Sequence, residues 1–172
     1  DSIPIPVFQA FRNQPPFYVL QLDAHIDWRD EVDGVKDGYS STMRRASEME
    51  WVTGIIQVGA HGVGSARKEE LEAAISYDAK IITSTQFKRE GIPSVIQHIP
   101  PGSRVFISMD YDVLDQSIMP AVGAPTPGGL MYADILQLFK TVIQNYETIG
   151  INLVEFVPEA DVNSLGTITA MR

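Results

Sequence analysis

Aspartate and histidine side chains gather directly after two apolar, strand-like segments of the sequence. The segment FYVLQL leads into DAHID, which contains Asp23, His25 and Asp27. The segment RVFISM leads into DYD, which contains Asp110 and Asp112. Aspartate is unfavourable inside strands and costly to bury without a partner. Two such clusters therefore indicate a buried positive charge, most simply a metal ion.

The spacing within each cluster predicts that its side chains converge. Alternate residues of an extended chain point to one side, which groups Asp23, His25 and Asp27, and also Asp110 and Asp112. Four carboxylates in one cleft would repel one another unless cations neutralised them, as two bridged divalent ions would. Oxygen ligands with one imidazole favour Mn²⁺, with Mg²⁺, Fe²⁺, Co²⁺ or Ni²⁺ as other candidates. The alternative is that these Asp residues cap helices and form turns.

The amino-acid composition indicates a globular protein and argues against some kinds of partner and metal site. The chain has 172 residues, 44% of them hydrophobic, which predicts one globular domain. Its formal net charge is -9, and it has no block of Lys and Arg, which argues against nucleic acid or an anionic membrane as a partner. It has no Cys, so any metal is held by oxygen and nitrogen. With no signal peptide and no apolar run near about 18 residues, we expect a cytoplasmic protein.

Segments rich in Val and Ile alternate with helix-like segments. We expect strands at Phe17–Leu22, Gly54–Val58, Ala79–Thr83, Arg104–Met109 and Ile149–Phe156. We expect helices at Thr42–Met49, Lys68–Tyr77, Pro93–His98 and Tyr132–Asn145. This alternation predicts an α/β fold with a parallel sheet and helices on both faces. Ligands of such sheets bind beyond the carboxyl ends of the strands, which is where the two Asp clusters lie.

Three segments, in this order, resemble signature blocks of the ureohydrolase superfamily, which includes arginase, agmatinase, formiminoglutamase and guanidinobutyrase. They are DAHID, SMDYDVLD followed by PAVGAPTPGG, and VEFVPEAD. The resemblance covers nearly the whole chain and is to agmatinase-like members. It implies a three-layer α/β/α sandwich on a mainly parallel sheet and a centre of two divalent metal ions, most commonly Mn²⁺. It also implies hydrolysis of the guanidino group of a small cationic substrate to urea and an amine.

The same resemblance implies a role for each clustered residue. Asp23 and Asp110 would bridge both metal ions. His25 and Asp112 would complete the shell of one ion. Asp27 would bind the other ion and hold the attacking water, so it is also a candidate catalytic residue.

Two further residues are candidates by resemblance, each with an alternative. Glu155 matches the Glu that pairs with the substrate guanidinium, which makes it a catalytic and substrate-binding candidate; otherwise it is a charge at a strand end. The family has a metal-binding His in a GGDH motif before the first strand, and Asp1 falls at that position here. We therefore expect Asp1 to bind metal, the alternative being a frayed terminus.

Many relatives carry a proton-shuttling His in an HGT-like segment after the DAHxD block. The corresponding stretch here, DGYSSTMRRASEM, contains no His. Ser40 and Ser41 lie nearest that position and are candidate substrate-binding residues, whereas Tyr39, His61 or a metal-bound water could replace the shuttle. The altered first-His position and the missing shuttle motivate one alternative function, a non-catalytic metal-binding homologue. A formimino or amide hydrolase of the same fold is a further alternative.

Two expectations concern the regions around this site. The charged loop Trp28–Tyr39 either reaches the tail of the substrate or is simply solvated. By resemblance, residues 1–172 form a single partial domain, with the amino-terminal part and the last helix of the family outside it. The activity of this chain alone is therefore left open, and we expect a homo-oligomer, either a trimer or a hexamer.

Overall fold

Five parallel strands form the central sheet of the computed structural model, which describes residues 2–172. The strand order is β3-β2-β1-β4-β5. The strands are β1 (Phe17–Leu22), β2 (Val52–Val58), β3 (Lys80–Ile82), β4 (Arg104–Asp110) and β5 (Glu147–Val154). This confirms the predicted α/β class with a parallel sheet.

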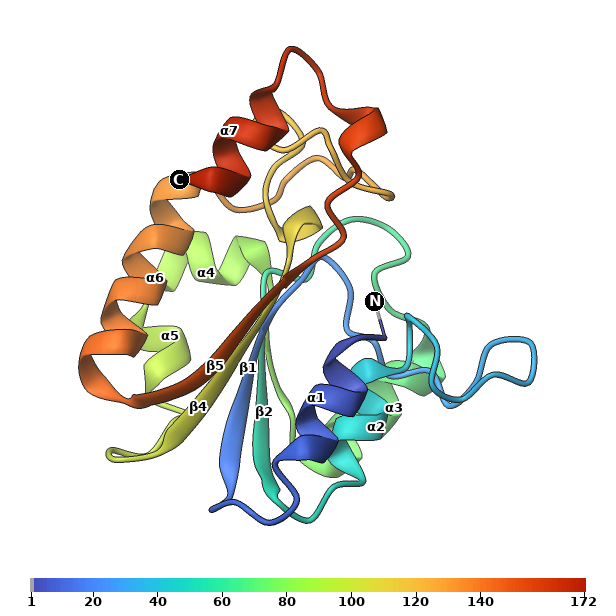
Figure 1. Ribbon diagram of the computed structural model, residues 1–172, viewed down its shortest axis with the longest axis vertical. Coiled ribbons are helices and arrows are strands. Elements are labelled where there is room, and N and C mark those ends of the chain that lie inside the picture. Colours follow the sequence, from blue (N-terminus) through green and yellow to red (C-terminus); the bar gives the residue numbers. More distant parts are fainter. Residues whose placement is uncertain (1) are drawn as a thin grey trace.

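Helices cover both faces of the sheet and so make three layers (Figure 1). One face carries α4 (Ser84–Glu90), α5 (Pro93–Ile96) and α6 (Tyr132–Asn145), and the other carries α1 (Pro4–Ala10), α2 (Thr42–Ser47) and α3 (Lys68–Tyr77). The helix α7 (Leu165–Met171) follows β5, and two short 3-10 helices are η1 (Tyr111–Val113) and η2 (Pro158–Ala160). No helix among residues 2–172 is long and apolar enough to cross a membrane.

Side chains that alternate along the central strands build two separate cores. On β1, Leu20 and Leu22 pack with Phe87 of α4 and Leu138 of α6. On the opposite face, Val19 belongs to a second cluster, which also contains residues of α1, α2 and α3. Because both faces of β1 are covered, its sequence is apolar at nearly every position.

The strand and helix bounds depart from the sequence predictions in a few places. β1, α3 and α6 have the predicted bounds, but α1 and α4 were not predicted. β5 spans Glu147–Val154 instead of Ile149–Phe156. Glu155 has a φ of 64°, which is outside the strand region and ends β5 before it. Glu155 is therefore the first residue after the strand.

Candidate metal centre

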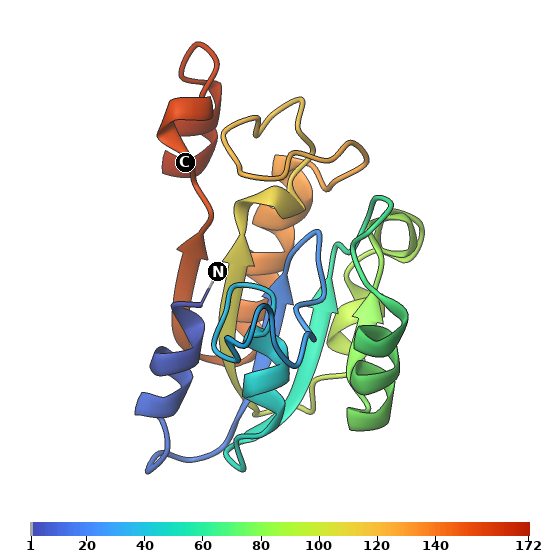
Figure 2. The ribbon, with the colours of Figure 1, turned by 90° about the vertical axis from the view of Figure 1, so that its right-hand side faces the viewer.

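The two Asp clusters meet because β1 and β4 are neighbours at the centre of the sheet. Leu22 pairs with Met109, so Asp23 and Asp110 leave the sheet side by side at its carboxyl edge. The loops that follow β2 and β4 lie beyond this edge (Figure 2). Asp23 and Asp110 are buried, with 5% and 7% of their surface exposed. The topology therefore places two carboxylates where a parallel sheet binds ligands.

The residues beyond the strands are positioned by tight turns, so the prediction of continued extended chain is wrong. Asp112 lies in η1, and its backbone N–H donates to Asp110 Oδ1 at 3.0 Å. The backbone N–H of His25 donates to Asp23 Oδ1 at 2.6 Å, and that of Ala24 donates to Asp112 Oδ1 at 3.0 Å. The hydrogen bond from Ala24 to Asp112 joins the two clusters, and the other two hold the turn within each cluster.

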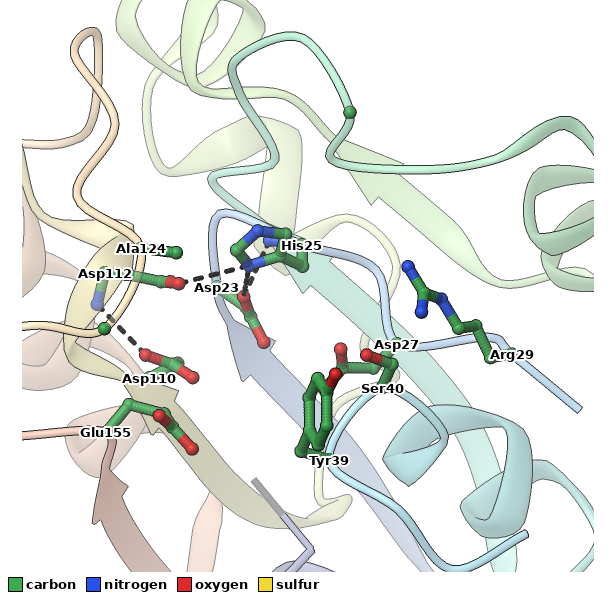
Figure 3. A pocket seen from close by; sticks show the side chains of 12 residues that line it. Asp23, His25, Asp27, Arg29, Tyr39, Ser40, Asp110, Asp112, Ala124 and Glu155 are labelled. Carbon is green, nitrogen blue, oxygen red and sulfur yellow. Dashed lines mark hydrogen bonds and ion pairs between the residues drawn. The ribbon is translucent and has the colours of Figure 1, made fainter. Parts of the chain in front are cut away.

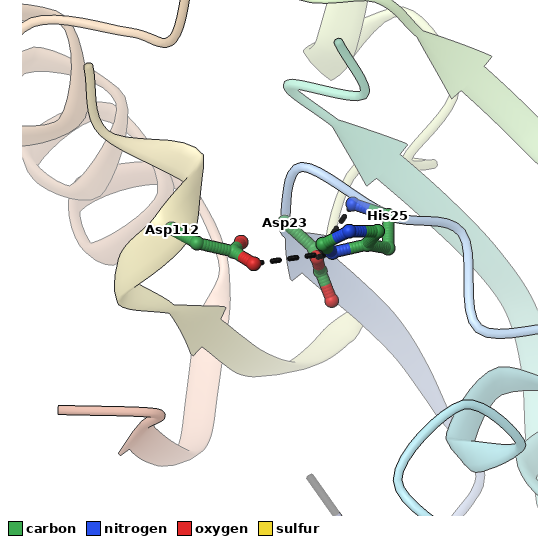
Figure 4. Close-up of side chains that lie close together, drawn as sticks. All are labelled: Asp23, His25 and Asp112. Carbon is green, nitrogen blue, oxygen red and sulfur yellow. Dashed lines mark hydrogen bonds and ion pairs between the residues drawn. The ribbon is translucent and has the colours of Figure 1, made fainter. Parts of the chain in front are cut away.

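Asp23, His25 and Asp112 offer ligand atoms that all lie within 4.8 Å of one another (Figure 4). His25 Nδ1 is 3.4 Å from Asp23 Oδ1 and 3.1 Å from Asp112 Oδ2. Three of the predicted ligands thus form a compact group of two carboxylates and one imidazole. Such a donor set suits a divalent ion that accepts oxygen and nitrogen ligands.

A cavity of about 510 Å³ joins this group to the other candidates (Figure 3). Beyond the three grouped residues, it is lined by Asp27, Asp110, Glu155, Arg29, Tyr39, Ser40, Gly64, Gly123 and Ala124. Ser41 does not line it, because it is fully buried at the N-cap of α2. The predicted ligand Asp1 lies outside the described residues.

Electrostatics support the binding of cations here. Burial and the nearby charges raise the pKa of Asp110, and burial together with Asp23 raises that of Asp27. Hydrogen bonds to Asp112 and Asp23 raise the pKa of His25 to about 11, because its proton is the positive charge next to these carboxylates. Divalent ions would supply the same compensation and free the imidazole to bind metal.

Two glutamines of the sheet form a hydrogen-bonded chain that ends on Asp23, and neither was predicted from the sequence. Gln21 Nε2 donates to Asp23 Oδ2 at 2.7 Å. Gln57 Nε2 donates to Gln21 Oε1, and Trp28 Nε1 donates to Gln57 Oε1 at 2.7 Å. Gln21 and Gln57 face each other in the register of β1 and β2. Each is an amide in an otherwise apolar strand of the sequence. A buried amide needs polar partners, so this pattern could have pointed to them.

His61, proposed from the sequence as a replacement proton shuttle, is held outside this cavity. Its Nδ1 lies 2.7 Å from Gly59 O, and its Nε2 lies 3.2 Å from Thr126 O. Both ring nitrogens are therefore engaged with backbone carbonyls of loops. Tyr39 and Ser40, in contrast, line the cavity.

The sequence and the fold are both similar to those of known proteins. The chain is 31% identical to N(1)-aminopropylagmatine ureohydrolase of Thermus thermophilus, over 95% of this chain and 54% of the relative. It is 32% identical to formimidoylglutamase of Bacillus subtilis, over 86% of this chain and 48% of the relative. The crystal structure of the Bacillus subtilis formimidoylglutamase superposes with a TM-score of 0.88 at 29% identity, covering 98% of this chain and 55% of that one.

The chain thus spans about half the length of the curated relatives it matches. The family model of the Arginase family matches residues 1–172, which is the whole sequence given. The matched region includes both Asp clusters and the segment around Glu155. The chain therefore belongs to the arginase family.

Proposed function

We propose that this protein is a dinuclear metal hydrolase that cleaves the guanidino group of a small substrate to urea and an amine. The proposal rests on one observation: five candidate metal ligands and Glu155 line the same cavity. Relatives named agmatinase and N(1)-aminopropylagmatine ureohydrolase support the same reaction class. We also expect a trimer or hexamer, as the family resemblance implies, and we keep the expectation that the protein is cytoplasmic.

The donor set fits two divalent ions, for which we propose Mn²⁺. Asp23 and Asp110, which leave the sheet side by side, would help to hold these ions. His25 and Asp112, which are 3.1 Å apart, would complete the shell of one ion, and Asp27 would serve the other. Asp1 remains a predicted further ligand. When bound, such a pair lowers the pKa of water to near neutrality and polarises the substrate.

The residues of the chain would then orient the reactants. Glu155 would accept N–H hydrogen bonds from the guanidinium, whose planar fork suits a carboxylate. Asp27 would accept a hydrogen bond from the attacking water. The water oxygen bonds to the guanidino carbon, the bond from that carbon to the alkyl nitrogen breaks, and both water protons end on the leaving amine. The products are urea and an alkylammonium ion, so atoms and charge balance.

Urea release tests this proposal. The whole protein, loaded with Mn²⁺, is offered agmatine, arginine, 4-guanidinobutanoate, 3-guanidinopropanoate and guanidine. We expect urea from at least one compound and none from Asp110→Asn, because this change removes a predicted metal ligand. Failure of every compound, or full turnover by Asp110→Asn, would contradict the proposal.

Two alternatives keep the fold and change the chemistry. A formimino hydrolase is favoured by the similarity to formimidoylglutamase, and it would release formamide instead of urea. A non-catalytic metal-binding homologue is favoured by the lining of the cavity, in which His25 is the one His among the described residues. Metal binding without any product would support this second alternative.

A further inference from the structure

Opposite charges stand at the two ends of the metal-centre cavity. Glu155 lies at one end, and Arg29 lies at the other, with its guanidinium directed toward the metal-ligand group (Figure 3). Arg29 is the only Lys or Arg side chain among the described residues that line the cavity. Every other charged group there is a carboxylate, apart from His25. The cavity is therefore polarised along its length.

The side chain of Arg29 is held through only one of its three guanidinium nitrogens. Its Nε donates to Glu70 Oε1 at 2.9 Å, and its backbone N–H donates to Ser40 O at 3.0 Å. Glu70 is buried at the start of α3, where its Oε2 accepts from the backbone N–H of Arg67 at 3.1 Å. Neither terminal nitrogen of Arg29 has a hydrogen-bond partner among residues 2–172, and the side chain is 26% exposed. These two nitrogens are free to bind a ligand.

The chemistry of this fork indicates what it would bind. The two terminal nitrogens of a guanidinium match the two oxygens of a carboxylate. An ammonium group at the same place would be repelled by the positive charge of Arg29. The four clustered aspartates would be neutralised by the metal ions, and Glu155 by the substrate guanidinium, which leaves Arg29 to select the other end of the substrate.

We propose, resting on the proposed function, that Arg29 binds a carboxylate at the distal end of the substrate. The substrate is then an ω-guanidino acid, a zwitterion, and not a guanidino amine such as agmatine. A cavity of about 510 Å³ is in the size range of small-molecule sites. The competing interpretation is purely structural, in which Arg29 only ties its loop to α3 through Glu70.

Matched substrates separate these interpretations. The compounds are 4-guanidinobutanoate, its neutral amide 4-guanidinobutanamide, and agmatine, with the three- and five-carbon acids and amides as a length series. We expect kcat/KM to favour the best acid over its own amide by on the order of 10- to 100-fold, as one charge-assisted carboxylate contact provides. Agmatine should be a poorer substrate than the amide.

Variants then assign that preference to one side chain. Arg29→Gln should raise KM for the acid by on the order of 10- to 100-fold, while KM for the amide changes little, and Arg29→Lys should restore part of the preference. Arg44→Gln is the matched control, because Arg44 carries the same charge nearby but does not line the cavity. A structural role predicts that Arg29→Gln impairs acid and amide equally, and this result would overturn the inference.

Failure of the inference is distinguishable from failure of the proposed function. If agmatine or the amides are hydrolysed faster than the acids, the guanidino hydrolase stands and the role of Arg29 is wrong. If no compound yields urea, calorimetric binding of the same acids and amides to the metal-loaded protein decides. Acid-selective binding that Arg29→Gln abolishes supports the inference, and its absence overturns it.

Discussion

β4 and β5 pair along their whole lengths, but they occupy different environments. Every residue of β4 after Arg104 is buried, whereas no residue of β5 is. Ile107 and Ile151 face each other in the register, yet Ile107 is 0% exposed and Ile151 is 44% exposed. β4 lies between two strands, and β5 is an edge strand of the described sheet.

The candidate site residues at the ends of these two strands differ in burial in the same way. Asp110 ends a strand that is packed on both faces, and Asp112 follows it. The backbone N–H of Asp112 donates to Asp110 and that of Ala24 donates to Asp112, which holds this turn. Glu155 follows the edge strand and is exposed. The predicted metal ligands therefore lie at the end of a buried strand, while the proposed substrate contact follows an exposed strand of the described sheet.

The largest expected effect comes from shortening the paired isoleucines. Ile107→Ala should lower the free energy of unfolding by about 3 kcal/mol, because it leaves a cavity in a packed core. Ile151→Ala, the matched control at the facing position, should cost less than about 1 kcal/mol. Urea denaturation of both variants measures the difference. Equal losses would show that β5 is as well packed as β4.

The next comparison concerns the effect on stability of neutralising Asp110, at the end of β4, or Glu155, just after β5. Without metal at pH 8, Asp110→Asn should stabilise the fold by about 2 kcal/mol, because burial raises the pKa of Asp110 to about 10 and the folded wild type must therefore bind a proton that its unfolded chain has released. The folded-state pKa of Asp110 lies above its unfolded value, so its contribution to stability is present at low pH and declines above about pH 4. Glu155→Gln should change stability less.

Thermal denaturation of the metal-free proteins between pH 4 and pH 8 tests this prediction. The advantage of Asp110→Asn should grow with pH and should vanish in the acid range, where the wild-type carboxyl is protonated in the unfolded chain as well as in the folded protein. A pH-independent advantage would mean that the titration of Asp110 is not its cause.

The sequence predicted the parts of this molecule whose signals are local. β1 is apolar throughout, and α3 and α6 have amphipathic patterns, so their bounds were predicted correctly. The short helices α1 and α4 lack such a pattern, and α1 has prolines in its first turn. Their place in the fold comes from packing on the sheet.

The candidate site shows the same division between local and distant signals. The Asp and His residues predicted as ligands lie in recognisable motifs, but the contacts that position them join residues far apart in the chain. Gln21 meets Gln57 only because β1 and β2 pair in one register, and Arg29 meets Glu70 across 41 positions. Neither contact can be predicted from the spacing of residues along the sequence.

The glutamine chain beneath Asp23 offers a smaller test of how the core positions metal ligands. Gln57→Leu should weaken Mn²⁺ binding by roughly 10- to 100-fold, because Gln21 and then Asp23 lose their orientation. Gln137→Leu, at an exposed position of α6, is the matched control and should leave the affinity unchanged. Calorimetric titration with Mn²⁺ measures both. An unaltered affinity in Gln57→Leu would show that Asp23 is oriented without this chain.

The pH dependence of metal binding gives the most specific test of the difference between the ends of β4 and β5. His25 has a pKa of about 11 without metal, so at neutral pH it must lose a proton before its nitrogen can bind an ion. Affinity for Mn²⁺ should therefore rise by about tenfold per pH unit for each proton released, between about pH 6 and pH 9.

The same titration can be assigned to one of the two strand ends. Asp112→Asn should flatten the pH dependence as well as weaken binding, because the hydrogen bond to Asp112 is the largest cause of the raised pKa of His25. Glu155→Gln should leave the pH dependence as in the wild type, since Glu155 follows the edge strand and is not among the residues that raise the pKa of His25. Calorimetry in buffers of different ionisation enthalpy counts the protons released. If Glu155→Gln changed that number as much as Asp112→Asn did, the ends of β4 and β5 would act as one titrating unit, and the division between a core-held metal centre and an edge-held substrate contact would be wrong.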